Sequence, residues 1–284
     1  MSSVDQFESV FRAADKDVLE YEQVEISSVL VITDLGTGEA KTFCGQVQEF
    51  LRVLDPIEVW DLANAKDFAT AEDLLELVET KRPDLICTYR NLHTAAWRFP
   101  YSLGVHLDVL LQRASMPVLV VPHPSAGYHA DHAFAHTDRV MAITDHLAND
   151  HHLVNYAARM TRPGGSLFLT HIEDQTVFDR YVDAISKIPT IDTDESRERL
   201  SIQLLKEPGE YIVSCQERLR AAGLQLTVEP IVAFGDHLSQ YRDHINSHQI
   251  DLLVMNAKDH DQLAMHGLAY PLVIELRQIP LLIL

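Results

Sequence analysis

Short apolar runs recur along this 284-residue chain in the same order, and this repetition constrains the fold more than any other feature. The run Ser-Val-Leu-Val-Ile-Thr-Asp at 28–34 has a counterpart, Arg-Val-Met-Ala-Ile-Thr-Asp, at 139–145. Three such matches occur in one order, namely 28–34 with 139–145, 84–87 with 251–254, and 104–121 with 267–284. Segments that repeat in this way indicate a duplicated domain.

Within each copy, the apolar runs alternate with segments of helical periodicity. Short apolar runs are typical of buried parallel strands, because helices cover both faces of such a sheet. We expect strands at 29–34, 57–62, 84–88 and 117–121, and then at 139–144, 166–170, 225–230, 251–255 and 280–284. We expect helices at 40–53, 70–80 and 104–114, and then at 150–161, 196–222, 236–248 and 264–277. The pattern predicts the α/β class, with two tandem three-layer domains that are each built on a parallel sheet.

The spacing of the matches predicts four segments. They are an N-terminal extension at 1–27, a trimmed domain at 28–122, a His-rich linker at 123–137 and a complete domain at 138–284. The second domain carries additional residues at about 173–232, so we expect the first to lack one helix–strand unit. In the extension, residues 4–20 have the apolar spacing of an amphipathic helix. That helix would pack on its own domain or form a dimer contact.

Charge and cysteine content exclude several classes of function. The chain has 42 acidic and 23 basic residues, a formal charge of −19, which argues against binding nucleic acid or anionic lipid. Its 3 cysteines form no CxxC pair, so neither a disulfide framework nor a cysteine zinc site is indicated. No apolar stretch approaches the length of a membrane span, and the first residues lack a secretory leader pattern. We predict a cytoplasmic protein without membrane insertion.

Several of these segments resemble the universal stress protein family, in a tandem form. The runs ending in Thr-Asp at 29–34 and 140–145 resemble the first strand of that family and its terminal aspartate. Phe-Gly-Asp at 234–236 resembles the loop before its fourth helix. The remaining likeness lies in the Asp-Leu strands at 84–87 and 251–255 and the closing strands at 116–121 and 279–283. The resemblance covers most of the chain and implies domains like those of the adenine-nucleotide alpha-hydrolases.

Members of that family that bind ATP carry the motif Gly-x2-Gly-x9-Gly-Ser/Thr after the fourth strand. Its glycines let the backbone approach the phosphates, and its last pair opens a helix whose N–H groups hold phosphate. Only the last glycine remains in each copy, as Gly104 and Gly267, and the hydroxyl residue that should follow is Val105 or Leu268. In the second copy Asp259 and Asp261 would also repel phosphate. The sequence therefore predicts that the phosphate cradle is absent.

The resemblance leaves five candidate site residues, all remnants of the nucleotide site of the family: Asp34, Asp145, Gly235, Gly104 and Gly267. Each aspartate would either contact a ribose or a metal-bound phosphate or cap the turn after its strand. Outside these five, Arg90, Arg98 and Lys258 would either hold an anion or be ordinary surface charges. We predict no catalytic residue, because the chain has no nucleophile elbow, P-loop or dinucleotide fingerprint.

Histidines are concentrated around the linker. Seven of the 15 lie between residues 123 and 152. If 128–136 were helical, His129, His132 and His136 would share a face near Asp131 and could bind zinc or nickel or respond to pH. The alternative is a polar linker without fixed geometry. We predict no metal site, since no recognised ligand motif occurs.

Two functional hypotheses follow. The first is a tandem universal stress protein that has lost ATP binding, needs no cofactor and acts in a stress response through contacts with unidentified proteins. Its two domains would form an intramolecular version of the family's dimer, with a homodimer as a further option. The second is a nucleotide-binding or small-anion-binding protein with a site rebuilt at Asp34 or Asp145, which would take ATP or another adenine nucleotide and hydrolyse it slowly. A third option is a regulatory chain that docks on an ion transporter.

Overall fold

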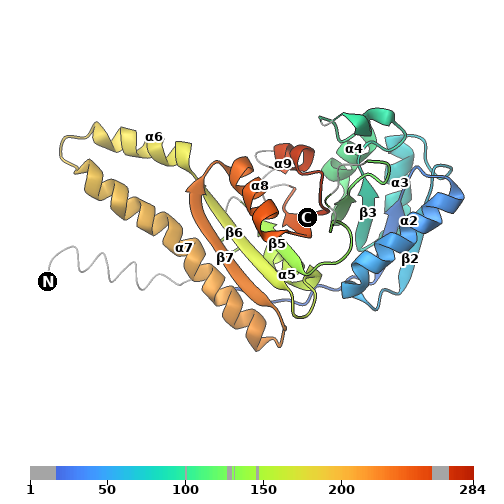
Figure 1. The fold of residues 1–284 in the computed structure, drawn as a ribbon, viewed down its shortest axis with the longest axis horizontal. Coiled ribbons are helices and arrows are strands. Elements are labelled where there is room, and N and C mark those ends of the chain that lie inside the picture. Colours follow the sequence, from blue (N-terminus) through green and yellow to red (C-terminus); the bar gives the residue numbers. More distant parts are fainter. Residues whose placement is uncertain (1–16, 100, 127–129, 131, 145–146, 258–268) are drawn as a thin grey trace.

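The computed structural model describes residues 17–99, 101–126, 130, 132–144, 147–257 and 269–284. Within them the strands form one nine-stranded sheet in the order β2-β1-β3-β4-β9-β8-β5-β6-β7. Neighbouring strands are parallel except β4 and β9, which pair antiparallel. The first half of the sheet comes from residues 28–121 and the second half from residues 139–283, as Figure 1 shows.

The first half alternates strands and helices. Its elements are β1 (Ser28–Ile32), α2 (Thr37–Phe50), the 3-10 turn η1 (Leu51–Leu54), β2 (Val59–Ala63), α3 (Ala71–Lys81), β3 (Leu85–Tyr89), the 3-10 turn η2 (Ala95–Arg98), α4 (Val105–Arg113) and β4 (Val118–Val121). Helix α3 begins where the sequence supplies a capping box. Thr70 accepts a hydrogen bond from the Asp73 N–H at 3.1 Å, and the Asp73 carboxylate accepts one from the Thr70 N–H at 2.9 Å.

The second half repeats this strand order and adds one unit. Its elements are β5 (Arg139–Ile143), α5 (His151–Met160), β6 (Ser166–Asp174), α6 (Gln175–Ser186), α7 (Thr193–Ala221), β7 (Thr227–Gly235), α8 (His237–His248), β8 (Leu252–Met255), α9 (Ala269–Glu275) and β9 (Leu281–Ile283). The order β6-β5-β8-β9 corresponds to β2-β1-β3-β4, and β7 extends the sheet beyond β6. The extra unit is α6, α7 and β7, close to the predicted insertion at 173–232.

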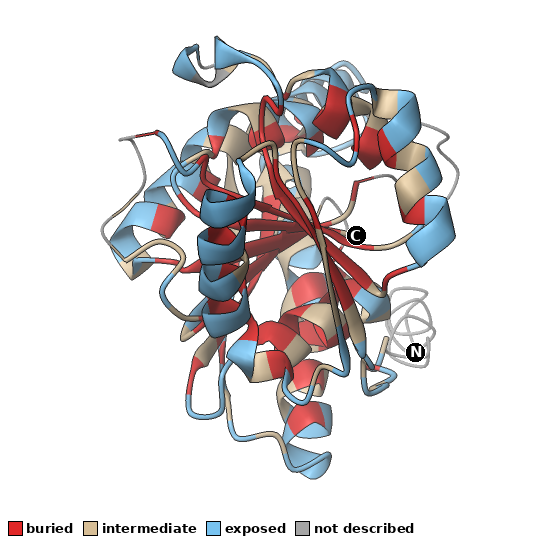
Figure 2. Cartoon of the chain, turned by 90° about the vertical axis from the view of Figure 1, so that its right-hand side faces the viewer, coloured by how far each residue is buried: buried red, intermediate tan, exposed pale blue. Residues whose placement is uncertain are grey.

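The predicted fold class is confirmed, and the structure adds how the two parallel sheets meet. Strands β4 and β9 pair through Val118 with Ile283, Leu119 with Leu282 and Val120 with Leu281, so the two sheets are continuous. Helices cover both faces, and the central strands lie in a fully buried layer in Figure 2. This explains why those strands are buried at every position and are mostly apolar.

Some predicted elements differ from the structure. The helix expected at 196–222 is one of two, because α6 precedes α7. Strands β6 and β7 run through Asp174 and Gly235, well beyond the ends predicted for them. Of the amphipathic helix expected at 4–20, residues 1–16 lie outside the described residues, and 17–20 are not helical. Instead the Leu19 N–H donates to the Ser214 hydroxyl on α7 at 3.1 Å. None of the helices in the described ranges has the length and apolar character needed to cross a membrane.

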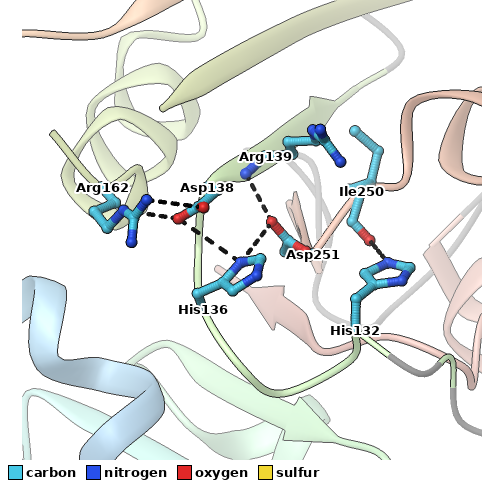
Figure 3. A network of polar contacts seen from close by, with 7 residues as sticks. All are labelled: His132, His136, Asp138, Arg139, Arg162, Ile250 and Asp251. Atoms are coloured by element: carbon cyan, nitrogen blue, oxygen red, sulfur yellow. Dashed lines mark hydrogen bonds and ion pairs between the residues drawn. The ribbon is translucent and has the colours of Figure 1, made fainter. Parts of the chain in front are cut away.

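Aspartates that precede matching strands receive backbone N–H groups of the neighbouring strand. The Oδ2 atom of Asp84, before β3, accepts from the N–H and hydroxyl groups of Ser27 and Ser28 at 2.8–2.9 Å. The Oδ2 atom of Asp251, before β8, accepts from the Arg139 N–H at 2.9 Å, as Figure 3 shows. Each aspartate thereby fixes the start of the adjacent strand, which explains why this residue recurs in both copies.

Candidate functional site

Polar side chains of the first half meet at the carboxyl ends of its strands, where parallel α/β sheets bind ligands. Asp34 follows β1, Tyr89 ends β3 and His93 lies in the next loop. One carboxylate oxygen of Asp34 accepts from the Tyr89 hydroxyl, and the other accepts from the His93 N–H at 2.7 Å. The hydroxyls of Tyr89 and Thr33 are 2.7 Å apart. Both oxygens of Asp34 are therefore occupied by groups of the chain itself.

The environment keeps the neighbours of Asp34 uncharged. Burial, reinforced by the hydrogen bond to Asp34, raises the pKa of Tyr89, so its hydroxyl stays protonated at neutral pH. Burial lowers the pKa of His123, although the charge of Asp34 opposes this shift. The rings of Tyr89 and His123 meet edge to face with centroids 4.8 Å apart. Among the described residues, no lysine or arginine side chain donates a hydrogen bond to Asp34. This cluster can orient hydrogen bonds, but it supplies no cation for phosphate.

The loop after β3 packs directly on the start of α4. Asn91 and His93 have φ angles of 62° and 59°, and Gly104 has a φ of 80°. A Cβ atom on Gly104 would lie 2.7 Å from the Asn91 Cα atom. The Asn91 N–H donates to the Leu103 carbonyl at 2.8 Å, and its side-chain amide donates to the Ser102 carbonyl at 3.1 Å. Gly104, a predicted site residue, is thus required by this close packing of the loop.

An aromatic cluster adjoins this loop. The ring of His93 lies 4.8 Å from Phe68 and 5.2 Å from His106, measured between centroids. The Nε2 atom of His106 lies 3.2 Å from the Ala69 carbonyl oxygen. The cluster places flat rings beside the loop whose His93 N–H bonds to Asp34.

The structure gives Arg90 a role other than the anion binding or the surface charge expected from the sequence. Arg90 is 1% exposed, and its guanidinium donates to the Val273 carbonyl at 2.6 and 3.2 Å and to the Leu276 carbonyl at 3.0 Å. It therefore caps the C-terminal end of α9 in the other half and is not a surface charge. Arg98 lies exposed in η2, and Lys258 is outside the described residues.

The matching edge of the second half is described only in part. Asp145 and Gly267 lie outside the described residues, as do Asp259, Asp261 and Leu268. In the described part, the Asn256 amide, after β8, donates to Asp150 at 2.6 Å. The other Asp150 oxygen accepts from the Leu153 N–H at 3.1 Å and caps α5. At this edge the described polar pair thus serves to begin a helix.

The position of Gly235 differs from the prediction of a loop at 234–236. Gly235 ends strand β7, in register with Asp174, and a Cβ atom there would lie 2.6 Å from the Gln240 Cγ atom. Asp236 then caps α8, accepting from the Ser239 N–H at 3.0 Å and hydroxyl at 2.6 Å, and these bonds lower the pKa of Asp236. Because β7 is at the far edge of the sheet from β1, the structure does not bring Gly235 to Asp34.

The linker histidines are fixed by separate partners. His132 Nε2 donates to the Ile250 carbonyl at 3.1 Å, and His136 Nδ1 lies 3.2 Å from Asp251 Oδ2 and 3.7 Å from Asp138 Oδ1 (Figure 3). This part of the linker therefore has a definite geometry. His129 and Asp131 lie outside the described residues. Among the side chains that the structure describes, no group of three or more metal-ligating residues is arranged to hold a metal ion.

The residues that sequence reasoning missed are the partners of Asp34. Tyr89 lies one residue beyond the strand predicted at 84–88 but ends β3 in the structure, while His93 contributes a backbone N–H, which no side-chain pattern reveals. A tyrosine at the carboxyl end of a fully buried strand is the one signal that could have pointed to the cluster.

Comparison with known proteins gives fold likenesses of low similarity. No protein-family model and no curated protein matches the chain. A universal stress protein from Archaeoglobus fulgidus DSM 4304 is 12% identical, covers 93% of this chain and 97% of its own, and has a TM-score of 0.48. The functionally unknown protein PA1789 from Pseudomonas aeruginosa PAO1 is 12% identical over 91% of this chain and 92% of its own, also at 0.48. The hypothetical protein MJ0577 is 14% identical over 52% of this chain and 96% of its own, at 0.40. None is similar enough to place this chain in a family.

Proposed function

We propose that this chain is a tandem protein of the universal stress protein type that does not bind ATP and acts in a stress response through protein contacts. The observation that carries the proposal is the occupied carboxylate of Asp34, whose two oxygens accept from Tyr89 and from the His93 N–H. A ribose hydroxyl or a metal-bound phosphate would have to compete with these internal donors for the carboxylate oxygens. The loop packed on Gly104 adds to this, because it covers the start of α4.

The proposal extends to the arrangement of the two halves, which would stand for the two subunits of the family's dimer. Its support is the antiparallel pairing of β4 with β9 and the shared strand order on either side of it. Sedimentation velocity tests this arrangement. Because β4 and β9 already pair within one chain, we expect the chain to be monomeric. A cytoplasmic location is also proposed, supported by the free thiols of Cys44, Cys87 and Cys215.

Equilibrium dialysis with labelled ATP and magnesium tests the loss of nucleotide binding. We expect no saturable binding at micromolar concentrations, and such binding would refute the proposal. Tyr89→Phe is the informative variant, because it removes the side-chain donor to Asp34 while keeping the ring. If internal donors exclude the nucleotide, Tyr89→Phe should bind ATP more tightly than the wild-type chain, and Tyr181→Phe, an exposed control on α6, should not.

A second candidate function, a nucleotide-binding or small-anion-binding protein with slow ATPase activity, is favoured by one observation. Asn91 and His93 keep positive φ angles, the backbone conformation that glycine would supply in a phosphate loop. This candidate predicts saturable ATP binding that Asp34→Ala or Asp145→Ala abolishes, together with slow release of phosphate. Binding that survives both substitutions would exclude it.

A further inference from the structure

A cavity of about 430 Å³ lies between α2 and the segments that flank the start and end of the linker. One wall is the α2 face of Phe43, Gln46 and Glu49, and the other two are residues 122–124 and 133–135. Small-molecule pockets in proteins span about 300–1,000 Å³ and are mostly apolar with a few polar groups. The cavity thus has the volume of a small-ligand site.

One wall of this cavity is held by an unfavourable backbone. Phe134 has a φ of 63°, a left-handed conformation that costs a bulky residue about 1–2 kcal/mol. In this conformation its ring lies against Phe43 at 6.3 Å, nearly parallel, and against Phe50 at 5.0 Å. Strained residues of this kind are concentrated at ligand sites, since the surrounding structure must hold them in place.

The opposite wall is rigid and carries a buried hydrogen-bonding group. His123 is 5% exposed and lies between Pro122 and Pro124, whose rings fix the backbone on both sides. Its Nδ1 atom accepts from the Ser125 N–H at 3.1 Å, which places the proton of the neutral ring on Nε2. The wall therefore contains a buried imidazole whose tautomer is defined.

The charges around the cavity disfavour anions. Among the described residues that line it, Glu49 is the one acidic side chain, and its carboxylate pairs with the Arg52 guanidinium at 2.8 Å on the exposed rim. The described lining includes no lysine or arginine. In a chain with a formal charge of −19, an anionic ligand would meet repulsion here, because the Arg52 guanidinium on the rim is already paired with Glu49.

We propose that this cavity binds a small uncharged aromatic or heteroaromatic compound, whose ring packs on Phe134, which is supported by the buried Phe43, and whose polar group reaches Gln46 at the mouth. This site adjoins the carboxyl edge of the sheet where Asp34 lies, but it has its own lining and goes beyond the proposed function. Tyr89 connects the two sites, since its ring contacts both His123 and Phe43.

Indole is a suitable probe, with indole-3-acetate as its anionic counterpart. Saturation-transfer NMR with the full chain is expected to show saturable indole binding, with a dissociation constant of about 0.1–1 mM for a ligand of this size. Indole-3-acetate should bind at least about tenfold more weakly, because it adds a charge that the lining does not pair. Failure of indole to saturate, or equal binding of the two probes, would overturn the proposal.

Two tryptophan substitutions on α2 locate the site. Gln46→Trp places a large ring at the mouth and is expected to weaken indole binding at least about tenfold. Gln48→Trp, on an exposed part of the same helix that does not line the cavity, should change it less than about twofold. Equal effects of the two substitutions would refute the assignment. Both positions are exposed, so circular dichroism is expected to show unchanged folding.

A third variant and a competitor separate this site from the nucleotide question. Phe134→Gly removes one ring wall and relieves the left-handed backbone, so it should lose indole binding while keeping the fold. Unchanged binding in that variant would also overturn the proposal. ATP should not displace indole, and the dialysis experiment on the Asp34 edge can fail or succeed independently of this result.

Discussion

Asp84 and Asp251 precede matching strands, yet their surroundings move the pKa of the two carboxyl groups in opposite directions. Partial burial would raise the pKa of Asp84, but the hydrogen bonds from Ser27 and Ser28 outweigh it and lower that pKa. Burial raises the pKa of Asp251, whose side chain is 1% exposed, more than the Arg139 N–H lowers it. Replacing each aspartate by asparagine removes the charge and retains an oxygen acceptor. The same substitution should therefore have different consequences in the two halves.

The magnitudes follow from the contacts. Asp84→Asn replaces four charge-assisted hydrogen bonds by weaker neutral ones at a partly exposed position, so we expect a loss of about 1–2 kcal/mol at pH 7. Asp251→Asn keeps the bond to Arg139 and removes a buried charge, whose half-exposed partner His136 contributes little. We expect that variant to be neutral or stabilised by up to about 1 kcal/mol at pH 7.

The pH dependence gives the sharper contrast. The folded pKa of Asp84 lies below the unfolded value of about 3.9, so its contribution is present above that pH and is lost as the pH falls through the folded pKa. The deficit of Asp84→Asn should therefore shrink in acid. The folded pKa of Asp251 lies above the unfolded value, so its contribution is present below about pH 4 and is lost as the pH rises. The relative stability of Asp251→Asn should therefore increase from acid to neutral pH.

Urea unfolding followed by circular dichroism, repeated between about pH 3 and pH 7, measures both differences. Because His136 contacts Asp251, the Asp251 pair is also compared in a His136→Gln background. Two difference curves with the same slope would refute the reasoning. So would a loss of more than about 2 kcal/mol for Asp251→Asn at pH 7, because an unpaired buried group would then outweigh the lost charge.

Two further substitutions test the packing around the candidate site. Gly104→Ala should destabilise the fold by at least about 2 kcal/mol in urea unfolding, because it adds a backbone clash to a positive φ. Gly164→Ala is the control, since Gly164 has a φ of 83° in open space and its substitution should cost about 1 kcal/mol. Equal costs for the two substitutions would contradict the close packing at Gly104. Arg90→Leu should destabilise the fold by about 2–4 kcal/mol and speed amide hydrogen exchange in α9. Arg98→Leu, at an exposed position, should change the stability by less than about 0.5 kcal/mol. Unchanged exchange in α9 after Arg90→Leu would contradict the capping role of Arg90.

The central strands could be predicted because every position in them faces a helix layer. In β3, all five residues from Leu85 to Tyr89 are buried, and a short run of this kind is typical of a central strand in a parallel sheet. The outer strands were harder. In β7 the pattern mixes exposed Glu229 and Pro230 with buried Ile231, as expected for a strand with one open edge, so its end at Gly235 was read as a loop.

The candidate site was only half predictable, because its defining contacts join residues far apart in sequence. A terminal aspartate such as Asp34 is a recognisable feature of a strand end. Its donors, Tyr89 and His93, come from a strand and a loop more than 50 residues away. Arg90 was more misleading still, since a charged residue in a loop is usually exposed. Its acceptors, Val273 and Leu276, lie 183 and 186 residues further along the chain.

The antiparallel junction explains several of these long-range contacts together. Because β4 and β9 run in opposite directions, the carboxyl edge of the first half adjoins the amino edge of the second, where Leu276 precedes β9. Arg90, in a loop of that carboxyl edge, can therefore reach the end of α9. For the same reason a short linker suffices, since it leaves β4 and enters β5 along this shared edge, contacting Asp251 through His136 on the way. The cavity beside Phe134 lies on this path and has a linker segment as one of its walls. A protein with two separate sheets would therefore lack this wall of the cavity.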